Sequence, residues 1–433
     1  MAIDLTPRWK DFAVYLPAQQ YHYASLTDSN RKMPQGRPFP EGYKLTDLDF
    51  LNPKSKLWHY GYALYSAGQF DTVANKACAV TNRDKSKTLI LGDSGGYQIG
   101  KGTLKGTEHF KKIKTADELC QVWRDSGDVR KRIVSWLDTH CDYAMTIDMP
   151  LWAREPRNKD TPFHKCSIEQ LIELTKLNLD YIKNNSNGRT RWLNVLQGTN
   201  PDDSLIWWKA FKDYEFDGWA LAGTVGWRGG LENVLHYVLN IRDDGGFDRT
   251  NWMHVLGTSM PPWAVLLTAI QKGIRANCNP EFRVSYDSAS PFQIGGKFQK
   301  ITRYPQYTRD INTWGFKVVP APINPMYADS CLHFPHASPL GDVLELGQLN
   351  VRGGEFEGVP VDAVGNAMLT NHNLYIYIRS LLEANELAFM NKSEADKAVP
   401  QALLDACDLI GDLFATKRWQ PKLKRNLDLI NQF

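Results

Sequence analysis

The sequence predicts an α/β protein built as a (β/α)8 TIM barrel with insertions. Short apolar runs of strand length alternate with amphipathic helical stretches, a pattern that over about 200 residues favours parallel strands joined by crossover helices. Most runs end in a polar or Gly-containing turn. The motif G-x-G-x-x-G does not follow the early runs, so an open dinucleotide-binding sheet lacks its usual marker.

The expected elements follow the chain in order. The segment from Thr27 to Lys56 is rich in Pro, Gly, Asp and Lys and is typical of a loop, so within one domain of residues 1–433 we expect an N-terminal insertion at 27–75. Strands are expected at six apolar runs: Leu89–Leu91, Tyr143–Ile147, Trp192–Leu196, Gly218–Leu221, Met253–Leu256 and Arg283–Tyr286. Helices are expected at Ser167–Asn184, Pro201–Lys212, Pro262–Lys272 and, within C-terminal helices over 373–433, at Ser393–Thr416.

Composition bounds the function classes. The chain has 433 residues, 51 Lys and Arg against 48 Asp and Glu, and 42% hydrophobic residues, which is ordinary for a globular protein. No run approaches the ~18 apolar residues of a spanning helix, and no secretory signal is visible, so we expect no membrane and a cytoplasmic location. The 7 scattered Cys fit a reducing compartment.

Polar side chains follow the apolar runs, and in a barrel they meet on the rim where active sites are built. They are Asp93, Asp148, Gln197, Gly223 and Asp287. A single Asp after a strand can simply cap the next helix. Three acids together with a Gln and Gly-containing turns favour a site.

The sharpest string is DSGGYQ, which follows the run Leu89–Leu91. After Asp93, the residues Ser94, Gly95 and Gly96 form a turn whose N–H groups no large side chain screens. Tyr97 can present a flat face to a planar heterocycle.

This string resembles the DSGG-[FY]-Q signature of the tRNA-guanine transglycosylase family. Further segments resemble the family in order between about Leu89 and Ile378. They are TIDMP at Thr146–Pro150, VLQGTNPDDS at Val195–Ser204, FDGWALAGTVG at Phe216–Gly226, HVLGTSMPPWAV at His254–Val265, VSYDSASPFQIGGKF at Val284–Phe298 and LTNHN at Leu369–Asn373.

The resemblance implies roles for these residues. Asp287 would be the nucleophile at the sugar C1′, and Asp93 the general acid and base that protonates the leaving base. Exchange with retention needs two such carboxyl groups, as in retaining glycosidases. The remaining implied roles concern the base: Asp148 would bind the N1–H and N2 edge of guanine, Gln197 and the Gly223 N–H would read O6, Tyr97 and Leu256 would sandwich the ring, and Thr224 would line the pocket for a ring substituent.

The family's zinc motif C-x-C-x-x-C is absent, but C-x-H-x-x-H stands at the same spacing. The resemblance implies structural zinc held by Cys331, His333, His336 and His372, in a zinc-binding insertion over 320–372. One thiolate and three imidazoles suit zinc. The alternative is an exposed His-containing loop whose metal site has been lost. No organic cofactor is expected.

The departures from tRNA-acting members resemble the 7-deazaguanine DNA transglycosylases of bacteriophages and bacteria. The partners implied are DNA and a 7-deazaguanine free base, with a homodimer as a further expectation and the host cytoplasm as location if phage-encoded. The runner-up is a tRNA-guanine transglycosylase. A catalytically inactive nucleic-acid-binding subunit and a barrel glycoside hydrolase are weaker alternatives.

Two basic clusters are candidate phosphate contacts. One follows the DSGGYQ loop, and the other, near the C-terminus, includes Trp419. They are Lys101, Lys105, Lys111, Lys112 and Lys114, and Lys417, Arg418, Lys422, Lys424 and Arg425.

Overall fold

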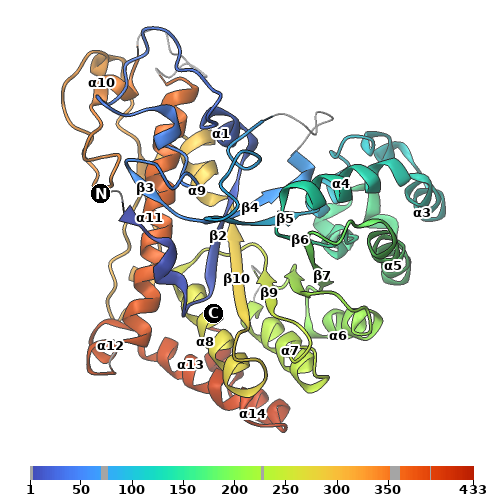
Figure 1. Cartoon of the computed structure of the whole chain (residues 1–433). Coiled ribbons are helices and arrows are strands. Elements are labelled where there is room, and N and C mark those ends of the chain that lie inside the picture. Colours follow the sequence, from blue (N-terminus) through green and yellow to red (C-terminus); the bar gives the residue numbers. More distant parts are fainter. Residues whose placement is uncertain (1–2, 70–76, 226–228, 352–360, 391) are drawn as a thin grey trace.

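Eight parallel strands close into a barrel in the computed structural model, which describes residues 3–69, 77–225, 229–351, 361–390 and 392–433 (Figure 1). Around the barrel the order is β10-β2-β4-β5-β6-β7-β8-β9. The strands are β2 (Val14–Gln19), β4 (Tyr62–Ser66), β5 (Leu89–Asp93), β6 (Tyr143–Met145), β7 (Arg191–Gln197), β8 (Gly218–Ala222), β9 (Trp252–Val255) and β10 (Arg283–Ser288). The predicted (β/α)8 TIM barrel is confirmed.

Two barrel strands were not expected from the sequence. β2 contains Pro17, a residue that weakens a strand assignment because it cannot donate to a ladder. β4 lies inside the range 27–75 that the composition marks as an insertion, yet it pairs with both β2 and β5. That part of the range is therefore a barrel strand. The short strand β3 (Trp58–His59) pairs with β1 (Ile3–Asp4) outside the barrel.

Helices surround the barrel, and several begin at clear sequence signals. In α5 (Ile168–Asn185), Ser167 accepts from the N–H of Gln170 in a capping box, which satisfies helix-start donors. In α6 (Pro201–Phe211), Asn200 caps the first turn. The others on this wall are α1 (Tyr21–Leu26), α2 (Gly96–Lys101), α3 (Ala116–Asp125), α4 (Gly127–His140), α7 (Gly230–Asp243) and α8 (Pro261–Asn277).

The C-terminal half adds a second layer. After β10 come α9 (Ser290–Phe292), a π-helical turn η8 (Gln293–Lys297), the antiparallel pair β11 (Lys300–Arg303) and β12 (Lys317–Pro320), and α10 (Leu346–Leu349). The long helix α11 (Ala363–Phe389) packs against α8, β11 and η8. The helix expected at Ser393–Thr416 is divided into α12 (Lys392–Ala398) and α13 (Gln401–Phe414), followed by α14 (Trp419–Arg425) and α15 (Leu427–Ile430).

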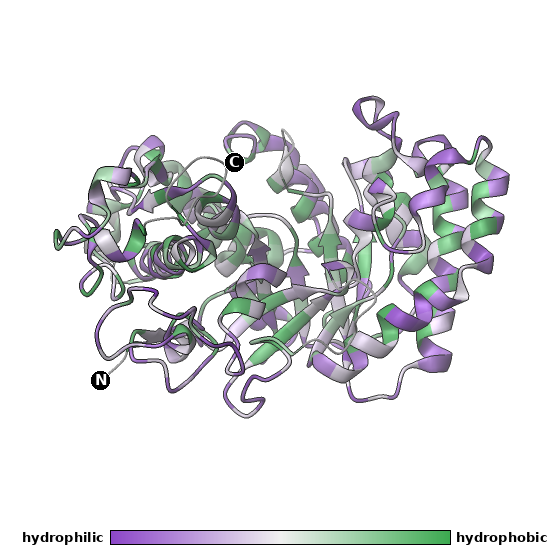
Figure 2. Cartoon of the chain, turned by 90° about the horizontal axis from the view of Figure 1, so that it is seen from above, coloured by the Kyte–Doolittle hydropathy of each residue, from purple (hydrophilic) through white to green (hydrophobic). Residues whose placement is uncertain are grey.

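Hydropathy follows this layering. In Figure 2, green hydrophobic segments fill the barrel and the inner helix faces, while purple segments line the outer edges. Burial of apolar surface in this core is the main stabilising contribution. Throughout the described ranges, no helix combines the length and the apolar character needed to cross a membrane.

Candidate active site

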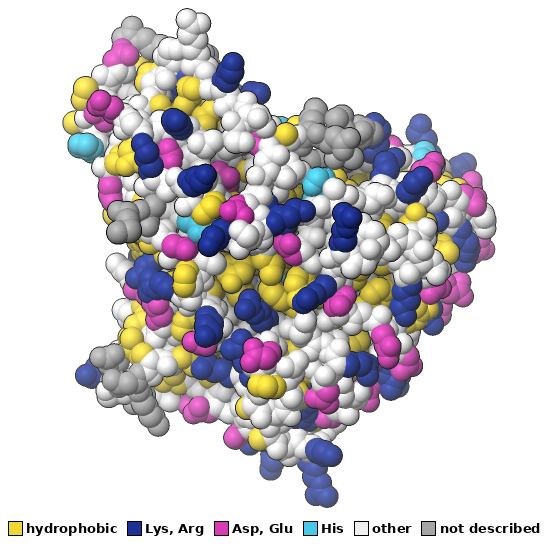
Figure 3. Space-filling view, in the orientation of Figure 1, with side chains coloured by type: hydrophobic (Ala, Val, Ile, Leu, Met, Phe, Trp, Pro, Cys, Tyr) yellow, Lys and Arg dark blue, Asp and Glu magenta, His cyan; other side chains and the backbone are white. Residues whose placement is uncertain are grey.

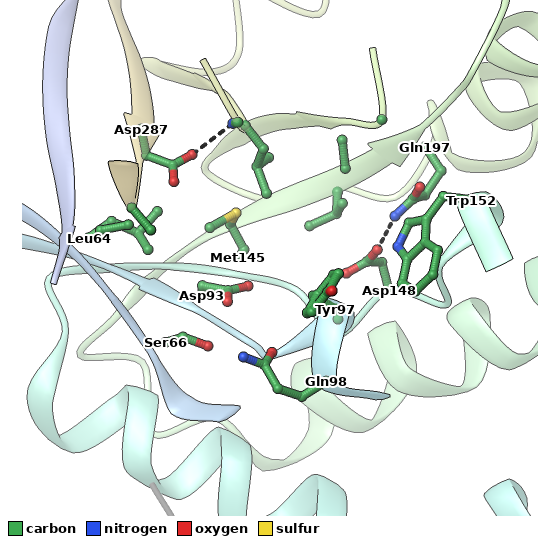
Figure 4. Close-up of a pocket in the computed structure, with 18 of the residues that line it drawn as sticks. Leu64, Ser66, Asp93, Tyr97, Gln98, Met145, Asp148, Trp152, Gln197 and Asp287 are labelled. Atoms are coloured by element: carbon green, nitrogen blue, oxygen red, sulfur yellow. Dashed lines mark hydrogen bonds between the residues drawn. The ribbon is translucent and has the colours of Figure 1, made fainter. Parts of the chain in front are cut away.

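A cavity of about 350 Å³ opens at the carboxyl ends of the barrel strands (Figure 4). Eight residues expected from the sequence line it: Asp93, Gly96, Tyr97, Asp148, Gln197, Gly223, Leu256 and Asp287. In the view of Figure 4, Asp287 lies at one end, Asp148 and Gln197 at the other, and Asp93 between them. The barrel thus brings together side chains that are almost 200 residues apart in the chain.

Three other expected residues do not line the cavity. Ser94 is buried and donates its hydroxyl to the carbonyl oxygen of Thr146 at 3.1 Å. Gly95 has a φ of 88°, a conformation that favours glycine. Thr224 is fully buried. Gly226, the last residue of the segment Phe216–Gly226, lies outside the described residues.

Asp287 stands near the end of β10, and two nitrogen atoms lie within hydrogen-bond distance of one of its oxygens. The backbone N–H of Gly257 donates to Oδ1 at 3.0 Å, and Nε2 of His254 lies 3.2 Å from the same atom. His254 is fully buried on β9. The other carboxylate oxygen, Oδ2, has no hydrogen-bond partner among the described residues, and the residue faces the cavity.

A second layer of contacts holds His254. Its Nδ1 lies 2.8 Å from Oγ of Ser285, and the indole Nε1–H of Trp252 donates to the same hydroxyl at 2.8 Å. The register of the sheet explains this, because His254 on β9 pairs with Ser285 on β10. Side chains two residues apart on a strand share a face, so Ser285 and Asp287 point the same way.

Asp93 ends β5 and has different surroundings. Burial raises the pKa of its carboxyl, and the nearby charge of Asp287 acts in the same direction. The hydroxyl of Ser66 and the N–H of Gly95, the latter at 3.2 Å, oppose that shift. A raised pKa favours the protonated form of a carboxyl, which suits a general acid.

Asp148 and Gln197 form a buried pair. Gln197 donates through Nε2 to Oδ2 of Asp148 (Figure 4). Burial raises the pKa of Asp148 to about 7, opposed by the Gln197 hydrogen bond and reinforced by the charge of Asp93. Oε1 of Gln197 is buried without a partner within the described structure. Such an atom costs free energy unless a ligand satisfies it, so this end of the cavity is suited to a polar planar ligand.

An aromatic pair lies at the mouth. The ring of Tyr97 is 62% exposed and stacks on Trp152, with ring centroids 5.5 Å apart. The ammonium of Lys101 lies 5.2 Å from the Trp152 ring centroid and 5.9 Å from that of Tyr97. Exposed rings beside a cation are suited to stack a base and to contact a phosphate.

Several lining residues were missed from the sequence. They are Gln20, Ser66, Gln69, Gln98 and Trp152, and behind them His254. Gln20 and Gln69 belong to no motif that would single them out, whereas Gln98 ends the DSGGYQ string. A signal existed for His254, which is the first residue of the segment HVLGTSMPPWAV, but a lone His in an apolar strand is more often a core residue.

The residues predicted to bind zinc do not come together as a metal site. His372 is buried, with Nδ1 2.9 Å from Oγ of Ser338 and Nε2 3.2 Å from the carbonyl oxygen of Thr302. Both ring nitrogens therefore have protein partners. Cys331 is exposed.

Packing also separates the predicted zinc ligands. Phe334 contacts the rings of both His336 and His372, whose centroids are 6.2 Å apart, and His333 lies in a β-bridge with Glu345. Across the described ranges, no group of three or more Cys, His, Asp or Glu side chains could hold a metal ion. The donor set does not fit zinc in this arrangement, and no step below uses the metal.

The two basic clusters have different positions. Lys101 reaches the mouth of the cavity, as described. In the second cluster, Trp419 donates to Asp243 at the carboxyl end of α7, and Lys422 pairs with Asp412. Because a barrel helix runs away from the active-site rim, this cluster lies toward the opposite end of the barrel.

Comparison with known proteins gives one relevant similarity. The chain is 24% identical over 158 residues to a queuine tRNA-ribosyltransferase from Chlamydia felis (strain Fe/C-56), covering 34% of this chain and 42% of that protein. The chain thus matches less than half the length of that relative. No model of a known protein family matches it. The similarity supports the tRNA-guanine transglycosylase superfamily that the motifs indicate.

Proposed function

We propose that this protein exchanges a base in DNA, replacing guanine with a 7-deazaguanine through a covalent glycosyl–Asp287 intermediate. The observation that carries the proposal is that two carboxyl groups, those of Asp93 and Asp287, line one cavity but have different hydrogen-bond and electrostatic surroundings. Oδ1 of Asp287 accepts the N–H of Gly257 and lies 3.2 Å from Nε2 of His254, whereas burial raises the pKa of Asp93. Two carboxyl groups with separate tasks are what a retaining glycosyl transfer requires.

The exchange proceeds in two displacements. A lone pair on Asp287 attacks C1′, the C1′–N9 bond breaks, and the bond's electron pair leaves with the guanine, which takes a proton from Asp93. The incoming base then returns a proton to Asp93 from its own ring nitrogen and attacks C1′ with the electron pair released there. The C1′–Asp287 bond breaks, and its pair returns to the carboxylate.

The pair of Asp148 and Gln197 supports a guanine-like base. Guanine offers N1–H and N2–H donors beside the O6 acceptor on one edge. When those donors bind Asp148, the Nε2 amide of Gln197 is released to donate to O6. Tyr97 supplies a stacking face for the base.

A polynucleotide substrate is favoured by the surroundings of the cavity. A second cavity of about 600 Å³ shares Gln20 with the first and is lined by Lys297, His22 and the exposed ring of Phe298. This second cavity offers space and a positive charge for the nucleotides next to the exchanged one in a polynucleotide strand. Figure 3 shows dark-blue Lys and Arg side chains around a central hydrophobic area on one face, a distribution compatible with phosphate contacts.

A tRNA substrate is the second candidate, because the similar protein is a queuine tRNA-ribosyltransferase. DNA is preferred on the sequence departures from tRNA-acting members, above all the missing Cys triplet. The arrangement of His336 and His372 around Phe334 is consistent with that departure.

One experiment separates the candidates. The full chain is incubated with DNA or with tRNA and isotopically labelled 7-cyano-7-deazaguanine, and each polymer is digested to nucleosides for mass spectrometry. We expect label in DNA, none with Asp287→Ala, and wild-type levels with Asp412→Asn, an exposed carboxylate distant from the cavity. Label in tRNA alone would select the second candidate, and label in neither polymer would refute base exchange.

A further inference from the structure

Behind the nucleophile proposed above lies a chain of buried hydrogen bonds from Trp252 through Ser285 and His254 to Asp287. Trp252, Ser285 and His254 are at most 3% exposed. Among the described residues, the Ser285 hydroxyl has Trp252 and His254 as hydrogen-bond partners, and the His254 ring has Ser285 and Asp287. The chemistry of each group therefore decides where the protons lie.

The order of donation follows from the indole. Trp252 Nε1 is a donor only, so it occupies an acceptor position of the Ser285 hydroxyl. Because the hydroxyl proton has no other acceptor among the described residues, it points to Nδ1 of His254, which then accepts. A neutral imidazole that accepts at Nδ1 carries its proton on Nε2, and that N–H faces Oδ1 of Asp287 at 3.2 Å.

The other protonation states fit less well. An Nδ1–H tautomer would direct the Nε2 lone pair at a carboxylate oxygen. An imidazolium would donate from both nitrogens, and the Ser285 proton would then lack an acceptor among the described residues, in a fully buried position. Buried polar groups without partners are costly, so the neutral Nε2–H tautomer satisfies the most groups.

We propose that His254, held as the Nε2–H tautomer by Ser285 and Trp252, is the positioning residue of the nucleophile, and that Oδ2 of Asp287 is the attacking atom. The proposal rests on the base-exchange function. Oδ1 is engaged by His254 and by the N–H of Gly257, which fixes the carboxylate plane. The Oδ2 lone pair then forms the bond to C1′ as C1′–N9 breaks, and the pair returns to Oδ2 in the second displacement.

The kinetic test uses variants of His254 in the full chain. Gln places an amide N–H near the position of Nε2, whereas Ala removes the donor. Adduct formation with a guanine-containing DNA oligonucleotide is followed by quenching in denaturant and separating the protein–DNA adduct. We expect His254→Ala to slow adduct formation about a hundredfold, as small misplacements of reacting groups do, and His254→Gln to stay within about tenfold of wild type, with KM for the oligonucleotide little changed in both.

Ser285→Ala tests whether the hydrogen bond from Ser285 to His254 is needed. It leaves the ring of His254 in place but removes the hydroxyl that selects the tautomer, so adduct formation should slow by about tenfold. His372 provides a matched control, because it is equally buried and also has a protein partner on each ring nitrogen. His372→Ala should lower thermal stability without slowing adduct formation per folded molecule.

A second readout does not depend on substrate. Nitrogen-15 shifts of the His254 ring identify the tautomer in wild type, and we expect the Nε2–H form. A wild-type Nδ1–H form or an imidazolium overturns the proposal whatever the enzyme acts on. Equal rates for His254→Ala and wild type, or His254→Gln as slow as His254→Ala while both fold, also overturn it. A wild-type protein that forms no adduct refutes the proposed function and this inference together.

Discussion

Replacing Asp148 with Asn should stabilise the protein at alkaline pH while it abolishes base exchange. The side chain is 6% exposed, and burial raises its pKa from 3.8 to about 7, reinforced by the charge of Asp93. The hydrogen bond from Gln197 opposes this shift without reversing it. The ionised carboxylate of Asp148 therefore destabilises the folded protein, and we expect it to be retained for its role in binding the base.

The size and the sign of the effect follow from proton linkage. Because the folded protein binds this proton more tightly than the unfolded chain, the stability that Asp148 contributes is fully present below pH 3.8 and is lost as pH rises toward about 7. Between those two pKa values the loss amounts to roughly 4 kcal/mol, at ~1.4 kcal/mol per pKa unit. Asn removes this pH-dependent loss but weakens the contact with Gln197 by ~1 kcal/mol. A net gain of about 1–3 kcal/mol at pH 8.5 is expected.

The assay is urea unfolding at pH 5 and at pH 8.5, with base exchange measured on the same preparations. Asp49 provides a matched control, since it is also buried and burial raises its pKa to about 7, yet it does not line the cavity. Asp49→Asn should give a similar pH-dependent gain and retain exchange. Asp148→Asn should lose exchange, because an amide offers the guanine N1–H and N2–H donors one acceptor in place of two.

Two results would refute this reasoning. If Asp148→Asn changes the free energy of unfolding equally at both pH values, the carboxyl does not titrate in the folded protein as its burial requires. If Asp148→Asn exchanges guanine at the wild-type rate, the residue does not read the base. Loss of exchange in Asp49→Asn would show that removing a buried carboxyl impairs exchange by disturbing the fold, and not by removing a contact with the base.

Three further predictions concern other parts of the molecule. Asp287→Asn should form no covalent adduct yet bind the oligonucleotide within about threefold of wild type, measured by fluorescence anisotropy; adduct formation would exclude it as the nucleophile. Tyr97→Leu should weaken binding of the free base by about ten- to a hundredfold, the usual worth of base stacking, whereas Tyr97→Phe should not; calorimetry would measure both, and equal losses would point to the hydroxyl. Treatment with a chelator should leave the melting temperature unchanged, because both ring nitrogens of His372 have protein partners; a fall of several degrees with stoichiometric zinc release would contradict this arrangement.

The barrel could be predicted because most of its strands carry a local signal. Leu89–Asp93 and Arg283–Ser288 each combine an apolar run with a polar end, which marks both the strand and the rim. β2 and β4 lack such a signal. Pro17 interrupts the strand pattern of β2, and loop-like composition surrounds β4. Both segments become strands because they pair with neighbouring barrel strands.

The candidate site was predictable only where chemistry and motif coincide. Asp93, Asp148 and Asp287 stand in recognisable strings and line one cavity. Trp152 has no such string and reaches the mouth through its contact with Tyr97. The zinc expectation rested on the family resemblance and on ligand spacing, and neither reveals that Phe334 packs against the rings of both His336 and His372.

The case of His254 shows why a nucleophile and its support must be specified together. Its partner Ser285 lies on another strand, and the register of β9 against β10 places the two opposite each other. A slip of one residue would turn His254 and Trp252 to the other face of β9 at once, which would remove the His254 contact from Oδ1 of Asp287. The packing that fixes this register therefore also fixes the position of the Asp287 carboxylate. Met253 and Val255 alternate with His254 and Trp252 along β9 and are fully buried. Substitutions at these two apolar residues should therefore slow adduct formation, by shifting the strand register, before they unfold the barrel.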